Sequence, residues 1–131
     1  MVSSEHSSRP SNHEAALTDL STRSLAMSPW WFYLVAIPAV AFSVNGIPHY
    51  VHGIGGLKFP TPFSGGAGTL DGPVRNVFWG GGNLIVGGLL LWLISPGFGD
   101  WRLVAELVVL ALLLGALLGM ALSRKKRPKA V

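Results

Sequence analysis

Two histidines, His49 and His52, stand three positions apart at the end of an apolar stretch. If a helix runs through both, their rings share a face, and neutral imidazole nitrogen is a good ligand for metals and haem iron. Two ligands do not complete a site, and Asp71 is the nearest carboxylate in the segment that follows. The alternative is that both histidines hydrogen-bond loop backbone at a membrane interface. The sequence points to no cofactor beyond this hypothesis.

Glu106 is the only ionisable residue inside the apolar stretch 103–122. A charged group at such depth is costly and is often functional, for example in proton or cation handling. Arg102 lies four positions earlier and therefore on the same helical face. We expect an ion pair between Arg102 and Glu106 near the membrane surface, with proton or cation handling as the alternative.

Small and polar side chains recur every three or four positions on two stretches, a pattern typical of closely packed membrane helices. The first stretch carries Asn76, Gly80, Asn83 and Gly87, and the second carries Ala111, Gly115 and Gly119. The turn between these stretches is short, so they should be antiparallel neighbours. We expect the two small-residue faces to meet, with Asn83 hydrogen-bonded between them. A polar pathway is the alternative use of the asparagines.

The sequence does not show the residue patterns of common enzymes. No nucleophile, base and acid are placed together, and the glycine runs at 65–68 and 80–82 lack the lysine of a phosphate-binding loop. The chain has no cysteine, which excludes disulfides, iron–sulfur clusters and thiolate catalysis. The sequence therefore favours a non-enzymatic role.

The elements that would position these residues are membrane spans. Of 131 residues, 50% are hydrophobic and 12% are charged, whereas about 25% of the residues in a soluble domain are charged. A bilayer core needs about 20 apolar helical residues, and the stretches 30–51, 76–94 and 103–122 are long enough. Asp100 is placed to cap the third helix. We therefore predict an all-α integral membrane protein with three transmembrane helices.

Two further segments lie outside these helices. Residues 1–28 form a polar, serine-rich tail that we expect to be disordered, with a weak helical pattern at 14–25. Residues 52–75 form a loop rich in glycine and proline, which is long for a bare connection. Its aromatic residues, including Phe59 and Phe63, predict an ordered loop that packs on the helices.

Basic residues set the expected orientation, because Lys and Arg accumulate on the cytoplasmic side. Five of the ten lie in the tail 124–131, which follows the transmembrane domain 29–123. With this tail inside, three spans place seven basic residues in the cytoplasm and three outside. We interpret the tail as a topology anchor, with binding to anionic lipid or nucleic acid as the alternative. In a protein with three transmembrane spans, however, we do not expect nucleic acid as a partner.

A cleaved signal peptide is a competing interpretation of the first span, because small residues stand at Ala41 and Ser43. The preceding region argues against it. A signal peptide has a short, positive leading region, whereas this one is 29 residues long and carries three acids against two arginines.

Three motifs resemble those of small multi-pass membrane proteins of bacteria whose function is not established. They are the run 44–53, the motif Phe59-Pro60-Thr61-Pro62-Phe63 and the motif Asn76-Val77-Phe78-Trp79-Gly80. The resemblance covers about residues 30–122. It implies the bacterial cytoplasmic membrane as the location and assigns no activity, cofactor or site residue.

Two functions of different kinds are consistent with these features. The first is a non-enzymatic membrane component or assembly partner, which packs against a further copy of itself or a larger membrane complex. The second is a transporter or channel with Asn76, Asn83 and Glu106 along its path. It would have to be oligomeric, because three spans enclose little space. Metal or haem binding by His49 and His52 is a minor third hypothesis.

Overall fold

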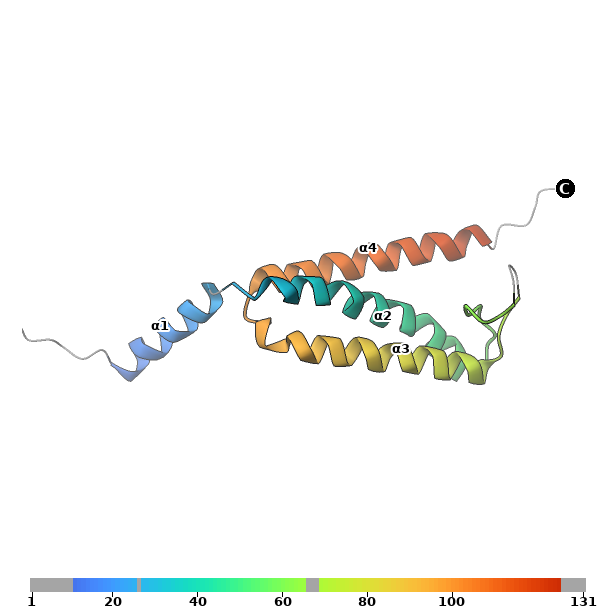
Figure 1. Cartoon of the computed structure of the whole chain (residues 1–131), viewed down its shortest axis with the longest axis horizontal. Helices are drawn as coiled ribbons and strands as arrows, with labels where there is room; N and C mark the ends of the chain where they lie inside the picture. Colours follow the sequence, from blue (N-terminus) through green and yellow to red (C-terminus); the bar gives the residue numbers. More distant parts are fainter. Residues whose placement is uncertain (1–10, 26, 66–68, 126–131) are drawn as a thin grey trace, which may run out of the picture.

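The computed structural model describes residues 11–25, 27–65 and 69–125. Their regular structure is helical. It comprises α1 (Asn12–Leu25), α2 (Trp30–Ile54), α3 (Pro73–Ile94), the short 3-10 helix η1 (Ser95–Gly97) and α4 (Trp101–Lys125). In Figure 1, α2, α3 and α4 lie together, α1 extends from one end, and the loop between α2 and α3 lies at the other.

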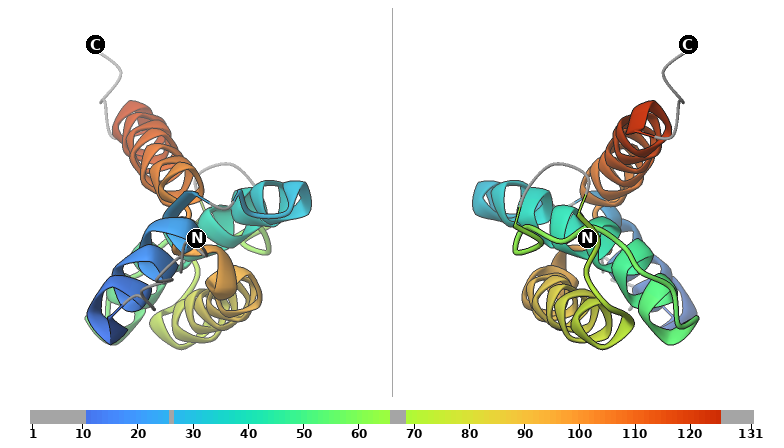
Figure 2. Two further views of the ribbon diagram at one scale, coloured as in Figure 1. Left: turned by 90° about the vertical axis from the view of Figure 1, so that its left-hand side faces the viewer. Right: turned by 90° about the vertical axis from the view of Figure 1, so that its right-hand side faces the viewer.

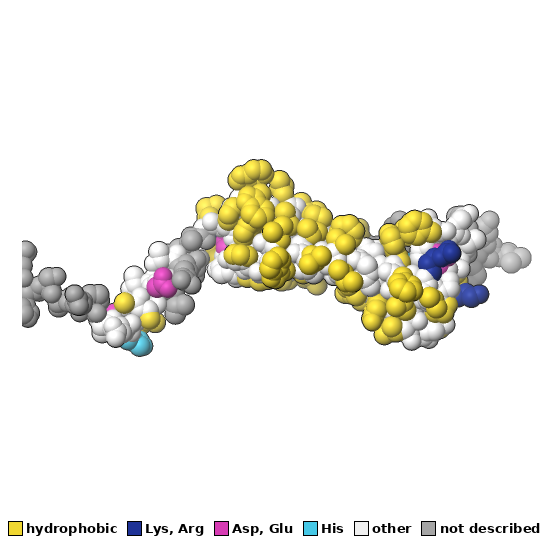
Figure 3. Space-filling model, turned by 60° about the horizontal axis from the view of Figure 1, so that its bottom comes forward, with side chains coloured by type: hydrophobic (Ala, Val, Ile, Leu, Met, Phe, Trp, Pro, Cys, Tyr) yellow, Lys and Arg dark blue, Asp and Glu magenta, His cyan; other side chains and the backbone are white. Residues whose placement is uncertain are grey.

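Among the described residues, three segments are long and apolar enough to cross a membrane: Trp30–Ile54, Pro73–Gly97 and Trp101–Ser123. The predicted all-helical fold with three such helices is confirmed; α2 and α3 each extend the predicted stretch by three residues at one end, and α4 extends it by two residues at its start and three at its end. On the face shown in Figure 3, apolar side chains cover the helical body and basic side chains gather at the loop end. This surface is compatible with a multi-pass membrane protein.

The helices α2 and α3 form the tight pair of the structure. A Cβ atom built on Gly80 would lie 2.8 Å from the carbonyl oxygen of Gly46, and one on Gly87 would lie 2.9 Å from the backbone nitrogen of Ser43. Such close approach of two backbones is possible only without side chains, and it increases the packing contacts that hold membrane helices together.

The helix α4 meets this pair only near its own start. Leu103 of α4, Ile94 of α3, and Phe32 and Ala36 of α2 are buried together as an apolar core. Beyond that core α4 diverges from the pair, as Figures 1 and 2 show. Only 6% of the apolar window of α4 is buried, against 28% for α2 and 22% for the segment that contains α3. Most of α4 therefore faces away from the rest of the chain.

The expected contact between the two small-residue faces is wrong for this chain. Gly80 and Gly87 of α3 face α2, where Gly46 lies against Gly80, and Ser43 and Ala39 lie against Gly87. Gly115 and Gly119 of α4 are exposed, and no atom lies within 4 Å of a Cβ built on either. Ala111, Gly115 and Gly119 therefore do not form a packed face within the chain. The physical reason is that Gly80 and Gly87 of α3 already pack against α2, the preceding helix.

The helix α1 occupies part of the tail that was expected to be disordered. Ser11 and Glu14 form a reciprocal capping box, in which the Ser11 N–H donates to Glu14 Oε2 at 3.0 Å and the Glu14 N–H donates to Ser11 Oγ at 3.2 Å. These local contacts, rather than tertiary packing, account for the helix. The expectations for residues 1–10 and 126–131 lie outside the described residues.

The loop between α2 and α3 packs on the helices, as predicted, in its described parts; residues 66–68 lie outside the described residues. Phe59 and Asp71 form an antiparallel bridge, with reciprocal N–H to oxygen distances of 3.2 and 3.1 Å. The Phe59 ring lies against both His49 and His52. The Phe63 ring meets Trp79 edge to face at 5.1 Å, although Phe63 remains 62% exposed. The aromatic residues therefore attach the loop to α2 and α3.

Candidate functional site

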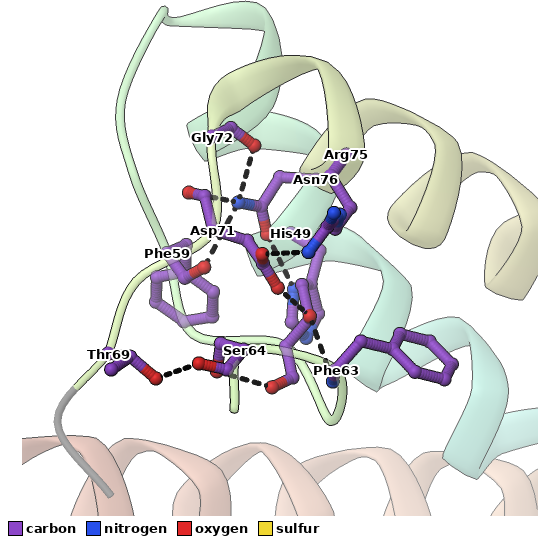
Figure 4. Close-up of polar contacts among 10 residues, drawn as sticks. His49, Phe59, Phe63, Ser64, Thr69, Asp71, Gly72, Arg75 and Asn76 are labelled. Atoms are coloured by element: carbon purple, nitrogen blue, oxygen red, sulfur yellow. Dashed lines mark hydrogen bonds and ion pairs between the residues drawn. The ribbon is translucent and has the colours of Figure 1, made fainter. Parts of the chain in front are cut away.

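A cluster of polar side chains lies where the loop covers the ends of α2 and α3 (Figure 4). We call it the loop-end cluster; it consists of His49, Thr61, Asp71, Arg75 and Asn76. His49 comes from α2, Thr61 and Asp71 from the loop, and Arg75 and Asn76 from the first turn of α3. All except Arg75 are buried.

Asn76 is the centre of this cluster and is fully buried. Its amide nitrogen donates to the carbonyl oxygens of Phe59 at 3.0 Å, Asp71 at 3.1 Å and Gly72 at 3.1 Å. Its Oδ1 lies 2.9 Å from His49 Nδ1. One side chain thus holds both strands of the loop and the start of α3 against α2.

These contacts assign the protonation pattern of the His49 ring. Because the Asn76 nitrogen faces three carbonyl oxygens, its Oδ1 must be the atom that faces His49. Oδ1 can only accept, so His49 Nδ1 carries a proton and donates it. In the neutral ring Nε2 therefore presents a lone pair.

Asp71 connects the loop residue Thr61 to Arg75 at the start of α3. Its carboxylate accepts the Thr61 hydroxyl and lies 2.5 Å from Arg75 Nη1. The Arg75 side chain is 60% exposed, so solvent weakens this ion pair. The buried Thr61 contact is the more rigid of the two, and it fixes the carboxylate in the loop.

His49 and His52 do not lie in a metal-ligand set. His52 Nδ1 donates to the carbonyl oxygen of Pro48 at 2.8 Å, and the Phe59 ring lies 5.0 Å from the His49 ring and 4.3 Å from the His52 ring. In the described ranges, no three residues of the types His, Cys, Asp and Glu are grouped so that they could hold a metal. The expected alternative, in which both histidines bind loop backbone, is not formed either: His49 binds the Asn76 side chain of α3, and His52 binds a backbone carbonyl of its own helix.

A groove of about 320 Å³ lies beside the loop-end cluster. Its walls come from α2, from the loop and from the far end of α4. The lining residues are Asn45, His49, Phe59, Pro60, Thr61, Pro62, Leu118, Ala121 and Leu122. Most of this lining is apolar, and His49 and Asn45 are its polar groups on α2.

At the opposite end of the bundle, Asp100 joins the starts of α2 and α4. Its Oδ2 accepts the Ser28 N–H at 2.8 Å and the Tyr33 hydroxyl at 2.6 Å, and its Oδ1 accepts the Arg102 N–H at 3.0 Å. The last contact confirms the predicted cap of α4. Hydrogen bonds, first from Ser28 and then from Tyr33, lower the pKa of Asp100 to about 2.

The expected ion pair between Arg102 and Glu106 is not formed. The Arg102 guanidinium lies 3.9 Å from Asp100 and 5.3 Å from the centre of the Trp101 ring. Asp100 lies just before the start of α4, and the arginine side chain turns back towards it rather than along the span to Glu106. Glu106 Oε2 is buried and has no hydrogen-bond partner among the described residues.

Asn83 is satisfied between α2 and α3 rather than between α3 and α4. Its amide nitrogen donates to the carbonyl oxygen of Trp79 at 2.7 Å, and its Oδ1 accepts from Asn45 Nδ2 at 3.4 Å. The structure thus places Asn76 and Asn83, which the sequence puts on one face, in two separate contacts with α2.

Two participants were not identified from the sequence. Neither Tyr33 nor Asn45 was singled out there. A polar residue within an apolar span was the available signal for Asn45. The partner of Tyr33 lies 67 positions away, and no local pattern could reveal it.

Comparisons with known proteins do not add a family to this geometry. No protein-family model matches the chain, and no curated protein or solved structure matches it either.

Proposed function

We propose that the chain is a non-enzymatic component of the bacterial cytoplasmic membrane, with its C-terminus in the cytoplasm. In this proposal it associates through α4 with a further copy of itself or with a larger membrane complex. One observation carries the proposal: α4 is the most apolar of the three candidate spans and yet the least buried, at 6%.

The glycines of α4 support this reading. A glycine inside a helix costs up to about 1 kcal/mol relative to alanine, and Gly115 and Gly119 make no close contact within the described chain that would offset it. Glycine four positions apart on an exposed face lets another helix approach closely. The stretch is therefore better suited to an intermolecular contact than to the fold of one chain.

The buried polar groups of the spans and of the segments that connect them support a structural role. Asn76 and Asn83 of α3, Asp71 of the loop and Asp100 of the turn before α4 each contact other groups of the chain, as the distances above show. A binding or catalytic path needs polar groups that face a substrate instead. The buried amides and carboxylates thus serve to join helices.

The exposed α4 face can be tested by cross-linking, because the chain has no cysteine of its own. Single variants Gly115→Cys and Gly119→Cys, labelled with a thiol-reactive photo-cross-linker that needs no thiol on the partner, should give cross-links in native membranes. Leu117→Cys is the matched control, since Leu117 is 57% exposed on a different face of α4. A dimer-sized product indicates a second copy, and a product of another size indicates a different partner. Equal or absent cross-linking at all three positions would contradict the proposal.

An oligomeric transporter or channel is the second candidate, and one observation favours it. Glu106 Oε2 is the buried, unpartnered carboxylate oxygen of the described spans. Flux of protons or cations in proteoliposomes should then be lost in Glu106→Gln while the helical content is unchanged. Flux that is absent in the parent protein, or unaffected by this change, would exclude the candidate.

A further inference from the structure

We infer that the groove beside the loop-end cluster binds a hydroxyl-bearing lipophilic molecule, whose O–H group donates to His49 Nε2. The groove measures about 320 Å³, which is at the lower end of the range for small-molecule sites. It therefore has room for a ring or a polar head with the first carbons of a chain.

The protonation pattern of the His49 ring determines which kind of ligand group it can bind. Nδ1 donates to Asn76, so Nε2 of the neutral ring is an acceptor and has no partner among the described residues. Among the described residues, two side-chain atoms are fully enclosed and have no hydrogen-bond partner, Trp79 Nε1 and Glu106 Oε2. His49 Nε2 also has no partner but does not belong to this group, so it is not fully enclosed, although only 5% of the His49 surface is exposed. Because His49 lines the groove, we assign this accessible nitrogen to it.

Asn45 adds a second acceptor one helical turn away. The Asn83 side-chain nitrogen donates to the Trp79 carbonyl oxygen at 2.7 Å, so Asn83 Oδ1 must be the atom that faces Asn45. The Asn45 nitrogen therefore donates, at 3.4 Å, and leaves Asn45 Oδ1 as an acceptor. Thr61 also lines the groove, but its hydroxyl already donates to Asp71. A ligand that matches these groups must supply a hydrogen-bond donor.

The remaining walls favour an apolar body for the ligand. They include Pro60 and Pro62 of the loop and Leu118, Ala121 and Leu122 of α4. The α4 residues belong to a helix apolar enough to span a membrane. A molecule that reaches the groove from a lipid phase can keep its chain against these side chains while its hydroxyl meets His49.

The test observes the histidine ring directly. Protein labelled with nitrogen-15 in histidine is placed in nanodiscs of phosphatidylcholine, which has no hydroxyl donor, at mildly alkaline pH. Dodecanol is then added, and dodecyl methyl ether serves as the matched ligand without a donor. The chain has four histidines, and single variants in which His6, His13 or His52 is replaced by Gln identify the signals that do not belong to His49. We expect dodecanol to shift His49 Nε2 in the parent protein, with Nδ1 protonated throughout, and the ether to leave it unchanged.

Two variants of α4 connect the signal to the groove without altering the histidine. Ala121→Phe fills the groove and should abolish the shift. Ala116→Phe is the control, because Ala116 is exposed on α4 and does not line the groove, and it should keep the shift. The inference is overturned if the ether shifts the signal equally, or if Ala121→Phe leaves the shift intact.

A third arm distinguishes a free lipophile from a lipid headgroup. Phosphatidylglycerol carries hydroxyl groups and is added to the nanodiscs in place of dodecanol. A shift with this lipid alone identifies the headgroup as the donor, and a shift with dodecanol alone identifies a free lipophilic alcohol. Absence of any shift with both overturns the inference.

Discussion

Asn76 Oδ1 and His49 Nδ1 lie 2.9 Å apart and join α3 to α2 at a fully buried point. The same asparagine holds three loop carbonyls through its nitrogen. The loop, the start of α3 and the end of α2 are therefore connected by one side chain.

Replacing Asn76 should destabilise the chain more than replacing another asparagine in a span. In membrane proteins a side-chain hydrogen bond contributes about 0.6 kcal/mol on average, and Asn76 makes four contacts. We expect Asn76→Leu to lower the free energy of unfolding in detergent by about 2 kcal/mol. Asn45→Leu, which removes one contact of 3.4 Å, should cost under about 0.6 kcal/mol. Equal losses would show that the buried network adds nothing.

The glycines of α3 should differ sharply in their tolerance of a methyl group. A Cβ on Gly80 would meet backbone atoms of α2, whereas one on Gly82 meets nothing within 4 Å. Gly80→Ala should lower stability by about 1–3 kcal/mol through overpacking, and Gly82→Ala should be neutral or stabilising by up to about 1 kcal/mol. Thermal unfolding in detergent measures both. If the order is reversed, α2 and α3 do not pack on this face.

Stability should depend on Asp100 at low pH. The ordinary pKa of this carboxyl is 3.8, and hydrogen bonds lower it to about 2 in the folded chain. A depressed pKa contributes stability that is complete above the ordinary value and is lost as the pH falls towards the folded value. The free energy of unfolding of the parent protein should therefore fall towards that of Asp100→Asn as the pH is lowered from about 4 to about 2.

Acid titration of unfolding in both proteins measures this difference. Tyr33→Phe removes one of the hydrogen bonds to the carboxylate, so its pH dependence should lie between those of the parent and Asp100→Asn. A gap between parent and Asp100→Asn that does not change with pH would refute the assignment.

Much of the fold could be predicted from local patterns. Length and hydropathy located the three long helices, and Asp100 was identified as a cap because capping depends on adjacent residues. The partner of each helix face was not predictable in this way. A glycine stripe shows that a face permits close approach, but which helix approaches depends on complementary residues such as Gly46, far along the chain. The sequence singled out His49, Asp71 and Asn76 of the loop-end cluster, but for different roles, because only the folding of the loop brings these residues into one network.

Lys58 and Gly99 should be accessible from opposite sides of the membrane. Lys58 lies in the loop between α2 and α3, and Gly99 lies in the turn before α4, at the other end of the bundle. Both are exposed, and a side chain at Gly99 meets no atom within 4 Å. In a chain without cysteine, Lys58→Cys should react with an impermeant maleimide only from the cytoplasmic side and Gly99→Cys only from outside.

Labelling of intact cells and inverted vesicles compares the two variants. Reaction of both from one side would contradict a membrane crossing by α3. Reaction with the sides exchanged would show that the basic end of the chain lies outside.

Glu106 should be replaceable by an apolar residue in the isolated chain. Its buried Oε2 has no partner among the described residues, and removing an unpaired buried polar group is commonly neutral or stabilising. We expect Glu106→Leu to retain or raise the melting temperature of the monomer in detergent. A clear loss of stability would mean that the carboxyl group makes a contact in the monomer, for example through a bound water.

Because α4 packs on the other helices near Asp100 and Leu103, at its own start, the rest of the helix can tilt about that end. The tilt of such a helix is not fixed by neighbours along its length, and tilting to match the bilayer costs only a fraction of a kcal/mol per Å of mismatch. Leu118, Ala121 and Leu122 lie in the part of α4 that can tilt and form one wall of the groove. A change of tilt in a bilayer would move these residues relative to α2 and the loop, so we expect the width of the groove to vary with the thickness of the surrounding membrane.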